Sequence, residues 1–544
     1  MSTDTARQRK YVFVTGGVCS SLGKGIANSA IGALLKSAGL KIFMQKLDPY
    51  LNVDPGTMSP FQHGEVFVTA DGGETDLDLG HYERFIDVNL SKQSSVTTGK
   101  IYLEVLERER RGDFLGGTIQ IVPHITNCIK EKIIGAAEAS GCEIMLIEIG
   151  GTTGDIEGLP YLEAIRQLRH ELGKENTLFV HVTLLPHLAG SKEVKTKPTQ
   201  ASVRELRSIG IQPDIILARA DHKIKDEHIK KIALFCDVNA EAVIPAPTLS
   251  SIYQVPVHFH EAGLGHQVAQ KLGLGDLKFD VSEWQNVANM IQNSTEEVSI
   301  ALVGKYTGLD DAYLSVIESL NIAAFHQQRK LKLVWVSAER LEKNHDKTWE
   351  KLKSCDGILV PGGFGTRGIE GKIIAANYAR KNNIPYLGIC LGMQLMTIEL
   401  AREVYNDPEI TSQEFDEEEK LDKSKYAIHF LPGQHHRKEK GGTLRLGNYN
   451  CKLDSNSKIG QLFNKPEVEE RHRHRYEFNE SYIEKLTANG LTISGTNPES
   501  GLVEMIELKN HPYMVGTQSH PEFLSRPNRP HPLFTGLIKA AISR

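Results

Sequence analysis

The chain has 544 residues and a formal net charge of −5 at pH 7, a length at which two or more domains are expected. Its composition, 40% hydrophobic and 24% charged, is that of an ordinary globular protein and excludes the strong positive charge of a nucleic-acid-binding protein. No apolar run is long enough to span a bilayer, and the polar first ten residues resemble no secretory signal. The seven cysteines include no CxxC pair, so they favour neither a disulfide framework nor a zinc ribbon. We therefore expect a cytoplasmic protein.

The first turn between a strand and a helix is rich in glycine. A short apolar strand, Tyr11 to Thr15, leads into Gly16 to Gly25, and a helix is expected from Ile26 to about Ser37. Such a turn presents backbone N–H groups to phosphate oxygens, and Lys24 would add a positive charge. The run from Gly16 to Gly23 is too long for a Walker A motif, and Gly25 replaces its Ser or Thr. An ordinary βα turn is therefore the alternative, and a metal bound there needs oxygen ligands from elsewhere.

Carboxylates that could supply those oxygens follow later in the chain. Asp76 and Asp78 lie in an acidic loop, and Glu148 ends a buried strand just before another glycine turn. Ligands of a parallel α/β sheet bind beyond the carboxyl ends of its strands, so the phosphate loop and Glu148 are expected at one edge. Taken alone, Asp78 would be interpreted as a solvated loop acid.

A second α/β pattern begins near residue 298. Before it, Pro213 to Arg219 is expected to form a strand and Lys230 to Cys236 a helix, and the pattern then weakens and becomes polar. Val298 to Gly304 starts a new strand, and a helix opens near Ala312. The sequence thus predicts a domain over 1–275, a linker over 276–297 and a second domain over 298–544.

The second domain contains a cysteine at a sharp turn. A buried strand, Ile384 to Ile389, is followed by Cys390 and by a helix from Leu391 to about Val404. Gly388 and Gly392 allow the turn, and the helix N-terminus favours a thiolate. This is the cysteine counterpart of the nucleophile elbow. An isolated cysteine after an apolar strand would more often be a core residue.

Two further segments favour a nucleophile. A strand ending in the glycine-rich turn Gly362 to Gly365 could line an oxyanion hole. Near the C-terminus, His520 would take the thiol proton and Glu522 would orient its imidazole. In this order the segments resemble a class I glutamine amidotransferase. Ser519 departs from that family, in which an aromatic residue more usually precedes the histidine.

Two charged runs have simpler interpretations. Strand alternation in Arg471 to Tyr476 places the arginines on one face and the histidines on the other, and no Cys or carboxylate completes a metal set nearby. The acidic run Asp416 to Glu419 is interpreted as a solvated loop.

Long runs of the chain resemble the CTP synthase family, from about Tyr11 to about Ala541. These runs are Lys46 to Pro60, His63 to Val68, Gly80 to Phe85, Pro123 to Asn127, Gly154 to Glu157 and Glu193 to Gln200. The resemblance implies two doubly wound α/β domains, each with a mainly parallel sheet. The first would be a P-loop-like synthetase domain and the second a class I glutaminase domain.

The resemblance implies binding roles in the first domain. Lys46 would assist phosphoryl transfer, and Asp78 and Glu148 would bind the Mg²⁺ that accompanies ATP. Where bacterial members often have Lys-Asp-Val, this chain has Pro247, Thr248 and Leu249, which affects the expected side-chain contact to adenine. The residues implied for ATP are Ser21, Leu22, Gly23, Lys24, Gly25, Ile26 and Asp78, and those for UTP or CTP are Ser20, Asp155, Ile156, Glu157, Lys195, Thr196, Lys197, Pro198, Thr199, Gln200 and Lys231.

Roles in the second domain are implied in the same way. Glu414 would bind the α-amino group of glutamine, Arg475 its carboxylate, and the N–H groups of Gly363 and Leu391 the oxyanion. The segment from Gly441 to Gly447 matches a lid associated with activation by GTP. The residues implied for glutamine are Gly363, Leu391, Gly392, Met393, Gln394, Glu414 and Arg475.

The resulting hypothesis is a two-step amination, in which ATP phosphorylates O4 of UTP and ammonia from glutamine displaces the phosphate. An internal tunnel gated near His63 and Val66, activation by GTP, competition by CTP and a homotetramer are implied by the family, and filament formation is left open. Another amidoligase with a glutaminase domain and a nucleotide-regulated scaffold with an inactive glutaminase are the alternatives.

Overall fold

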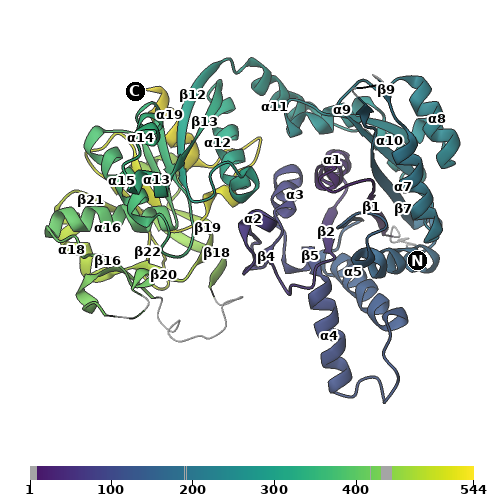
Figure 1. Cartoon of the computed structure of the whole chain (residues 1–544), viewed down its shortest axis with the longest axis horizontal. Helices are drawn as coiled ribbons and strands as arrows, with labels where there is room; N and C mark the ends of the chain where they lie inside the picture. The colour runs from purple at the N-terminus through teal and green to yellow at the C-terminus, as the bar shows by residue number, and fades with distance from the viewer. Residues whose placement is uncertain (1–8, 189, 191–192, 417, 419, 431–443) are drawn as a thin grey trace, which may run out of the picture. The chain divides into compact units, whose positions relative to one another are not determined.

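The chain forms two compact units in a computed structural model that describes residues 9–188, 190, 193–416, 418, 420–430 and 444–544 (Figure 1). The first unit contains residues 9–54 and 81–289, and the second contains residues 55–80 and 290–544. No helix among the described residues is long and apolar enough to cross a membrane.

The first unit is organised around a parallel sheet with the strand order β11-β10-β7-β1-β6-β2-β5. Strand β1 lies at its centre, where Val14 is opposite Glu148 of β6 and Val180 of β7. Continuous runs of Val, Ile, Leu and Phe suit strands that are buried on both faces. The strands are β1 (Lys10–Gly16), β2 (Ile42–Asp48), β5 (Ser95–Thr97), β6 (Ile144–Ile149), β7 (Thr177–Leu184), β10 (Ile215–Ala220) and β11 (Val243–Pro247).

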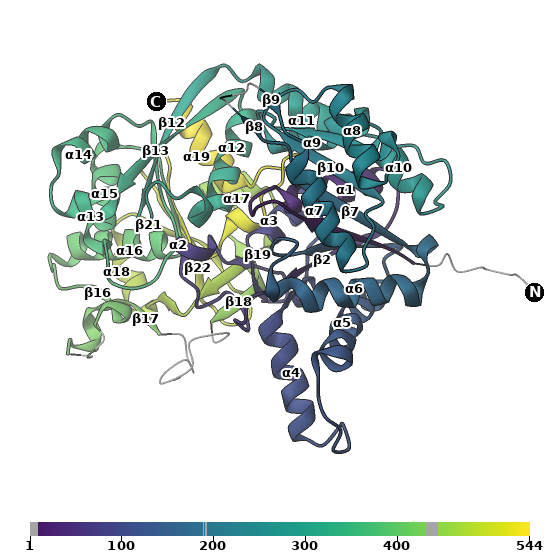
Figure 2. The same cartoon turned by 45° about the vertical axis from the view of Figure 1, so that its right-hand side comes forward.

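Helices cover both faces of this sheet. Phe13, Met145 and Ile147 pack in one core with α5 and α6, which Figure 2 shows beneath the strands, whereas Gly32 of α1 approaches Leu146 on the opposite face. The helices are α1 (Lys24–Ser37), α3 (Asp78–Ile86), α4 (Thr98–Arg110), α5 (Thr126–Ser140), α6 (Leu159–Leu172), α7 (Lys197–Ser208), α8 (Asp226–Cys236), α9 (Val255–Glu261), α10 (Leu264–Lys271) and α11 (Ser282–Asn293). A short hairpin of β8 (His187–Leu188) and β9 (Glu193–Val194) precedes α7.

The second unit has a mixed sheet with the strand order β13-β12-β14-β15-β23-β22-β21-β18-β19. The pairs from β13 to β23 are parallel, and the pairs from β23 to β19 are antiparallel. The strands are β12 (Glu296–Gly304), β13 (Arg329–Ser337), β14 (Gly357–Val360), β15 (Tyr386–Ile389), β18 (Arg445–Leu453), β19 (Glu467–His474), β21 (Leu491–Thr496), β22 (Val503–Leu508) and β23 (Met514–Thr517). A smaller sheet contains β16 (Thr411–Ser412), β17 (Tyr426–Phe430) and β20 (Tyr476–Phe478).

Two apolar cores lie on opposite faces of the larger sheet. Ala301 and Val303 of β12 pack with α15 and α16, whereas Ile300 and Leu302 pack with α12 and α19. The helices are α12 (Leu314–His326), α13 (Ala338–Glu342), α14 (Asp346–Lys353), α15 (Ile369–Asn382), α16 (Leu391–Tyr405), α17 (Lys458–Phe463), α18 (Ile483–Ala488) and α19 (Pro532–Ile542).

Residues 55–80 pack with the second unit, although they lie between β2 and α3 in sequence. We call this stretch the inserted segment. It contains α2 (Pro60–His63) and a two-stranded sheet of β3 (Phe67–Val68) and β4 (Glu74–Thr75). Its last residues begin α3, which continues into the first unit.

The expected fold class, α/β with two mainly parallel sheets, is confirmed, and the second sheet is extended by an antiparallel half. Element ends differ by a few residues: α1 begins at Lys24 rather than Ile26, and β15 begins at Tyr386, after Pro385. The stretch over 276–297 that we expected to be a linker contains α11, and β12 begins at Glu296.

Candidate active sites

Cys390 lies between β15 and α16 in a strained backbone conformation. Its φ of 51° and ψ of −104° are rare for a residue with a side chain. The turn is held by the Cys390 N–H, which donates to the Thr517 carbonyl at 2.7 Å. It also requires Gly392, because a Cβ there would lie 2.1 Å from the carbonyl oxygen of Val360. The elbow inferred from the glycines is therefore formed.

His520 is buried beside Cys390 and is oriented by Glu522. Its Nδ1 lies 2.7 Å from Glu522 Oε1, and its buried Nε2 makes no hydrogen bond with the described residues. Burial alone would lower the pKa of His520, but Glu522 and Cys390 raise this pKa to about 10. The imidazolium is thus favoured when Cys390 is a thiolate. The structure brings all three predicted catalytic residues of this unit together.

Two glutamines support the thiol. Gln518 Nε2 lies 3.6 Å from Cys390 Sγ, and Gln518 Oε1 accepts a hydrogen bond of 3.2 Å from Gln394 Nε2. Gln394 was predicted to bind glutamine, whereas Gln518 was missed. Its place two residues before the histidine, on a strand end that faces the elbow, was the available signal. Met393 packs in the core against Gly516, so only its backbone can reach a ligand.

The glycine turn after β14 lies over the elbow. A Cβ on Gly362 would approach His520 Cε1 to 2.8 Å, and one on Gly363 would lie 3.5 Å from Leu391 Cδ2. Gly363 and Leu391 are therefore neighbours, as an oxyanion hole formed by their N–H groups requires. Gly392 is fixed by Tyr386, whose hydroxyl donates to its carbonyl oxygen at 2.9 Å.

A lysine missed by the sequence analysis lies behind this turn. Lys372 of α15 is completely buried, and its Nζ lies 3.5 Å from the Pro361 carbonyl oxygen. Burial and, to a smaller extent, the charge of Lys305 lower the pKa of Lys372 to about 7, although Cys390 and Glu414 oppose the change. Helical periodicity alone places Lys372 on the inner face of α15, a position that usually holds an apolar residue.

Replacing Lys372 by methionine is expected to raise the melting temperature most at low pH. The pKa of about 7 in the folded state lies below the usual value near 10.4, so folding expels a proton between these pH values. The destabilisation of the folded protein by Lys372 is complete below pH 7 and disappears as the pH rises toward 10. Thermal unfolding at pH 6, 8 and 10 tests this, with Lys381→Met on the exposed side of α15 as control. A gain that does not change with pH would contradict the buried charge.

Polar groups that suit the backbone of an amino acid lie at the edge of the same turn. Glu414 Oε1 accepts a hydrogen bond from the Gly365 N–H at 2.7 Å, and Lys305 Nζ donates to the Phe364 carbonyl at 2.6 Å. Burial raises the pKa of Glu414, and the Gly365 N–H and the charges of Lys305 and Arg475 oppose the rise. Burial lowers the pKa of Lys305 to about 8. The predicted pair Glu414 and Arg475 is thus joined by Lys305, which was missed.

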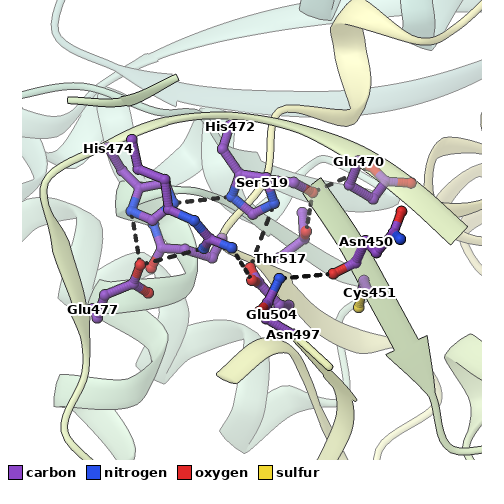
Figure 3. A network of polar contacts seen from close by, with 12 residues as sticks. Asn450, Cys451, Glu470, His472, His474, Glu477, Asn497, Glu504, Thr517 and Ser519 are labelled. Carbon is purple, nitrogen blue, oxygen red and sulfur yellow. Dashed lines mark hydrogen bonds and ion pairs between the residues drawn. The ribbon is translucent and has the colours of Figure 1, made fainter. Parts of the chain in front are cut away.

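Ser519 replaces the expected aromatic residue with a link in a buried polar chain. Its hydroxyl lies 2.6 Å from Thr517 Oγ1 and donates to Glu470 Oε2 at 3.2 Å (Figure 3). Glu470 Oε1 lies 3.0 Å from His531 Nε2. The backbone N–H of His520 donates to the Arg471 carbonyl at 2.7 Å. The departure at Ser519 therefore keeps the catalytic loop attached to β19.

The two histidines of β19 are buried on one side of the strand, as alternation predicts. His472 Nδ1 lies 2.9 Å from His474 Nε2, and these rings meet Glu504 and Glu477 (Figure 3). Burial lowers the pKa of both histidines well below the usual value and raises the pKa of Glu477 well above it. No group of three or more His, Cys, Asp and Glu side chains able to hold a metal occurs among the described residues.

A cavity of about 210 Å³ opens beside Cys390. Its walls include His520, Gly363 and Arg473, together with Glu65 and Val66 from the inserted segment. His63, on the same segment, lies apart from these walls, and its Nε2 is 3.2 Å from Asp76 Oδ2. Residues 441–443 of the proposed lid lie outside the described residues. Gly447 lies against the inserted segment, because a Cβ on Gly447 would be 2.7 Å from the Ala70 carbonyl oxygen.

In the first unit, the glycine-rich turn surrounds Lys24. Its Nζ donates to the Gly151 carbonyl at 2.5 Å, and a Cβ on Gly16 would lie 2.6 Å from Lys24 Cδ. Gly23 caps α1 with a φ of 80°. Leu22 and Gly25 are buried, whereas Ser20 and Ser21 are exposed on the turn. A side chain at Gly16 would therefore displace Lys24 from its place in this turn.

Glu148 and Lys46 lie opposite each other on β6 and β2. Glu148 is buried and accepts a hydrogen bond from the Tyr82 hydroxyl, and Lys46 Nζ lies 3.5 Å from Asp48 Oδ1. Asp78 begins α3 and its N–H donates to Asp76 Oδ1 at 3.0 Å. Carboxylate oxygens are the ligands that Mg²⁺ prefers, and a buried carboxylate at the carboxyl edge of the sheet suits it. Glu148 therefore has the chemistry and the position that the expected metal ligand needs.

A cavity of about 170 Å³ lies beside the glycine-rich turn. It is bounded by Ser21, Gly23 and Ile26 on one side and by residues 247–249 on the other. Thr248 Oγ1 donates to Asp221 Oδ1 at 2.6 Å and accepts from Arg219 Nη2 at 3.3 Å. Pro247, Thr248 and Leu249 thus form a wall of the cavity in which the Thr248 hydroxyl is already hydrogen-bonded to Asp221 and Arg219.

Apart from Ser20 on the glycine-rich turn and Lys231 of α8, the residues implied for UTP lie on two segments. Asp155, next to the exposed Ile156 and Glu157, accepts from the Thr152 N–H at 2.8 Å, and the Thr153 N–H donates to the Gly16 carbonyl at 2.7 Å. The second segment, whose members gather at the start of α7, comprises Lys195, Thr196, Lys197, Pro198, Thr199 and Gln200.

Lys231 is linked to this second segment because its charge affects the pKa of Glu193. The hydrogen bond from Lys195 lowers the pKa of Glu193, and the charges of Lys195 and Lys231 lower it further. Gln200 Nε2 donates to Thr196 Oγ1 at 3.1 Å, and Thr199 Oγ1 donates to Thr183 Oγ1 at 3.1 Å. The exposed lysines Lys197 and Lys231 are thus presented around a helix N-terminus, which suits an anion.

Both halves of the chain match known families. The family model for the CTP synthase N-terminus matches residues 10–274, and the model for class I glutamine amidotransferases matches residues 309–540. A relative from Carboxydothermus hydrogenoformans, named CTP synthase, is 56% identical over 533 residues, which are 98% of each chain. The chain belongs to the CTP synthase family. The resemblance inferred from the sequence is therefore confirmed, and the protein is a glutamine-hydrolysing ligase.

Other members of the CTP synthase family are similar along almost the whole chain. CTP synthases from a Roseiflexus species and from Chloroflexus aurantiacus are each 55% identical and cover 98% of this chain, and 95% and 96% of their own. The solved glutaminase domain of Trypanosoma brucei CTPS with bound acivicin is 36% identical and covers 45% of this chain and 94% of that chain, with a TM-score of 0.42. Family membership assigns the glutamine-dependent amination of UTP to CTP, a step of pyrimidine biosynthesis.

Proposed function

We propose that Cys390, His520 and Glu522 release ammonia from glutamine and that the first unit phosphorylates O4 of UTP with ATP, so that ammonia displaces phosphate and forms CTP. The observation that carries the proposal is the strained Cys390 elbow, which lies beside a buried His520 whose pKa is raised by Glu522 and Cys390. We would not expect an inactive glutaminase domain to keep a strained backbone and buried charged groups at this position.

Hydrolysis of glutamine begins when the Cys390 thiolate attacks the side-chain amide carbon. The N–H groups of Gly363 and Leu391 stabilise the oxyanion that forms. His520 Nε2 gives its proton to the leaving nitrogen, so ammonia departs and a thioester remains. Water, deprotonated by His520, then attacks the thioester and releases glutamate and the thiolate. Glu522 holds the imidazole in the orientation that both steps need.

The arrangement of Glu414, Lys305 and Arg475 supports glutamine as the substrate. A carboxylate and two cations around one rim can bind the α-amino and α-carboxylate groups, and the guanidinium can contact both carboxylate oxygens. The cavity beside Cys390 is about 210 Å³, a size that suits an amino acid rather than a peptide.

Activation of UTP requires the phosphate-binding residues of the first unit. The glycine-rich turn and Lys24 would hold the phosphates of ATP, and Lys46 would stabilise the transferring group. Mg²⁺, held by Asp78 and Glu148, would neutralise charge on the β- and γ-phosphates. The triphosphate of UTP, or of CTP as a competing product, would bind Lys195, Lys197 and Lys231 near the start of α7.

Ammonia has to travel to UTP as the free base, because ammonium is not nucleophilic. The cavity beside Cys390 extends to Val66 of the inserted segment, which supports an internal route that begins there. His63, on the same segment, would gate this route. GTP would activate the glutaminase through the segment that ends at Gly447.

A homotetramer is proposed from the family and is supported by apolar side chains on the surface of the first unit. They gather on α4 and on the loop that follows it, and are Leu103, Leu106, Leu115, Ile121 and Val122. Patches of this kind are typical of interfaces between subunits.

The test is the conversion of UTP to CTP by the purified chain with ATP and Mg²⁺. We expect CTP with glutamine plus GTP and, in a separate assay, with ammonium chloride. Omitting GTP should slow only the glutamine reaction, and added CTP should inhibit both. Activity with ammonium alone would contradict the proposed glutaminase, and no CTP from either nitrogen source would contradict the whole proposal.

A further inference from the structure

The inserted segment places a buried carboxylate at the start of a glutaminase helix. Glu65 Oε2 accepts a hydrogen bond of 2.9 Å from the Ser315 N–H, and Oε1 is bonded to the Ser315 hydroxyl. The Glu65 N–H donates to the Asp311 carbonyl at 2.8 Å. Residue Tyr313, which precedes α12, offers no side-chain cap. Glu65 therefore caps α12 from a distant part of the sequence, where the helix dipole favours a negative charge.

The capped helix reaches the catalytic residues through one further serine. Ser319, one turn along α12, donates to the Ser315 carbonyl at 2.7 Å and lies 3.3 Å from the carbonyl oxygen of Glu522. All of these side chains are buried. A path of close polar contacts therefore runs from Glu65 through Ser315 and Ser319 to the backbone of Glu522, the residue that orients His520.

A parallel contact is made by rings. Phe67, two residues after Glu65, meets the ring of Phe523 edge-on with a centroid distance of 4.9 Å. Phe523 in turn stacks on the imidazole of His520 at 5.3 Å and an interplanar angle of 13°. Such ring pairs favour defined orientations. The same segment therefore supports both His520 and its partner Glu522.

The arginines of β19 join the inserted segment to the other side of the site. Arg471 Nη1 donates to the Val68 carbonyl at 3.0 Å, and its own carbonyl accepts the His520 N–H at 2.7 Å. Arg473 pairs with Glu74 at 2.9 Å, and its carbonyl oxygen lies 3.9 Å from Cys390 Sγ. His520 and Cys390 thus each contact an arginine that also holds the inserted segment.

We propose that Glu65 is a positioning residue of the glutaminase, whose buried carboxylate fixes Ser315 and Ser319 so that Glu522 and His520 are correctly set only when the inserted segment is docked. This inference rests on the proposed roles of Cys390, His520 and Glu522. The role explains why a carboxylate is buried at this position. Burial of a charge costs free energy even when hydrogen-bond donors are well placed, and an apolar residue would be sufficient for packing. The segment is continuous with β2 and α3, which carry Lys46 and Asp78 of the proposed ATP site.

The test compares Glu65→Gln with Asp71→Asn in the full-length protein. The glutamine side chain keeps the volume of Glu65 but sets an amide donor against the donors of Ser315, whereas Asp71 is an exposed acid of the same segment. For Glu65→Gln we expect kcat of glutamine-dependent CTP formation to fall about 10-fold or more, because a hydrogen bond to a charged group is lost. The KM for glutamine should change by less than about 2-fold, and ammonium-dependent activity and the Asp71→Asn variant should stay near the native values.

A second measurement separates positioning from general destabilisation. The rate at which iodoacetamide alkylates Cys390, followed by mass spectrometry of its peptide against pH, reports how reactive the thiol is. In Glu65→Gln this rate should fall near pH 7, because His520 is held less well beside the sulfur. Ser319→Ala, a mild change, should give a smaller decrease in the rate. An unchanged profile in both variants, or equal loss with glutamine and ammonium, would overturn the proposal.

Cys390→Ala is the reference for these assays. If it retains glutamine-dependent activity, the proposed catalytic residues are wrong and the inference falls with them. If it loses that activity while Glu65→Gln behaves like Asp71→Asn, the catalytic residues stand and the positioning role is wrong.

Discussion

Replacing Cys390 by alanine is expected to abolish glutamine-dependent CTP formation and to leave ammonium-dependent formation intact. The variant removes the only atom able to form the thioester, and loss of the nucleophile of a catalytic triad costs about 10⁴-fold or more. The side chain is small and buried, so alanine is expected to fit the elbow apart from its strained φ of 51°. CTP formation is measured with each nitrogen source at saturating ATP and UTP.

Cys451 provides a control for this variant, because it is a buried cysteine of β18 whose pKa is raised by burial and which the mechanism does not use. Cys451→Ala should retain both activities. Loss of the ammonium reaction in Cys390→Ala would mean that the elbow also supports the first unit. Retention of the glutamine reaction would mean that another residue is the nucleophile.

Replacing Glu148 by alanine should abolish CTP formation with both nitrogen sources while the fold is retained. The carboxylate lies at the carboxyl end of the central part of the sheet, opposite Lys46, where the phosphates of ATP would be held. A lost metal ligand at such a site costs about 100-fold or more, because charge on the transferring phosphate is no longer neutralised. Initial rates over a range of Mg²⁺ concentrations, together with circular dichroism, provide the measurement.

Glutamine hydrolysis can be followed separately in the Glu148→Ala variant by the release of glutamate. It should continue at a measurable rate, since the triad lies in the other unit. Glu138→Gln, on the exposed side of α5, should behave like the native protein. Ammonium-dependent CTP formation in Glu148→Ala would remove this residue from the metal site.

Local patterns predicted the elements and the nucleophile well. The strands β1, β6 and β15 are short apolar runs with glycines at or near their ends, and glycine allows the sharp turns that follow these strands. The pairing of Cys390 with His520 could be predicted because each residue follows a parallel strand, and parallel strands end at the same edge. The register of Gly388 opposite Gly516 brings these two ends together.

Contacts between distant segments could not be predicted from the sequence. Gln518 and Lys372 resemble an ordinary strand residue and an ordinary helix residue, and only the folded chain brings them to Cys390 and Gly363. The antiparallel half of the second sheet also depends on pairing between β18 and β21, which are far apart in sequence. No single-sequence pattern indicates that residues 55–80 pack with the second unit, because their partners Ser315 and Arg471 are hundreds of residues away.

The position of the inserted segment has a consequence for the synthesis of the protein. Phe67 leaves the ribosome long before Phe523, and at about 5–20 residues per second the interval is roughly 20 to 90 seconds. During this time the nascent chain carries Glu65 and Phe67 without their final partners. In a partly synthesised chain, residues 55–80 should therefore be open to proteolysis and bound by chaperones, and they should become resistant only when the C-terminal strand β23 and the loop after it are complete.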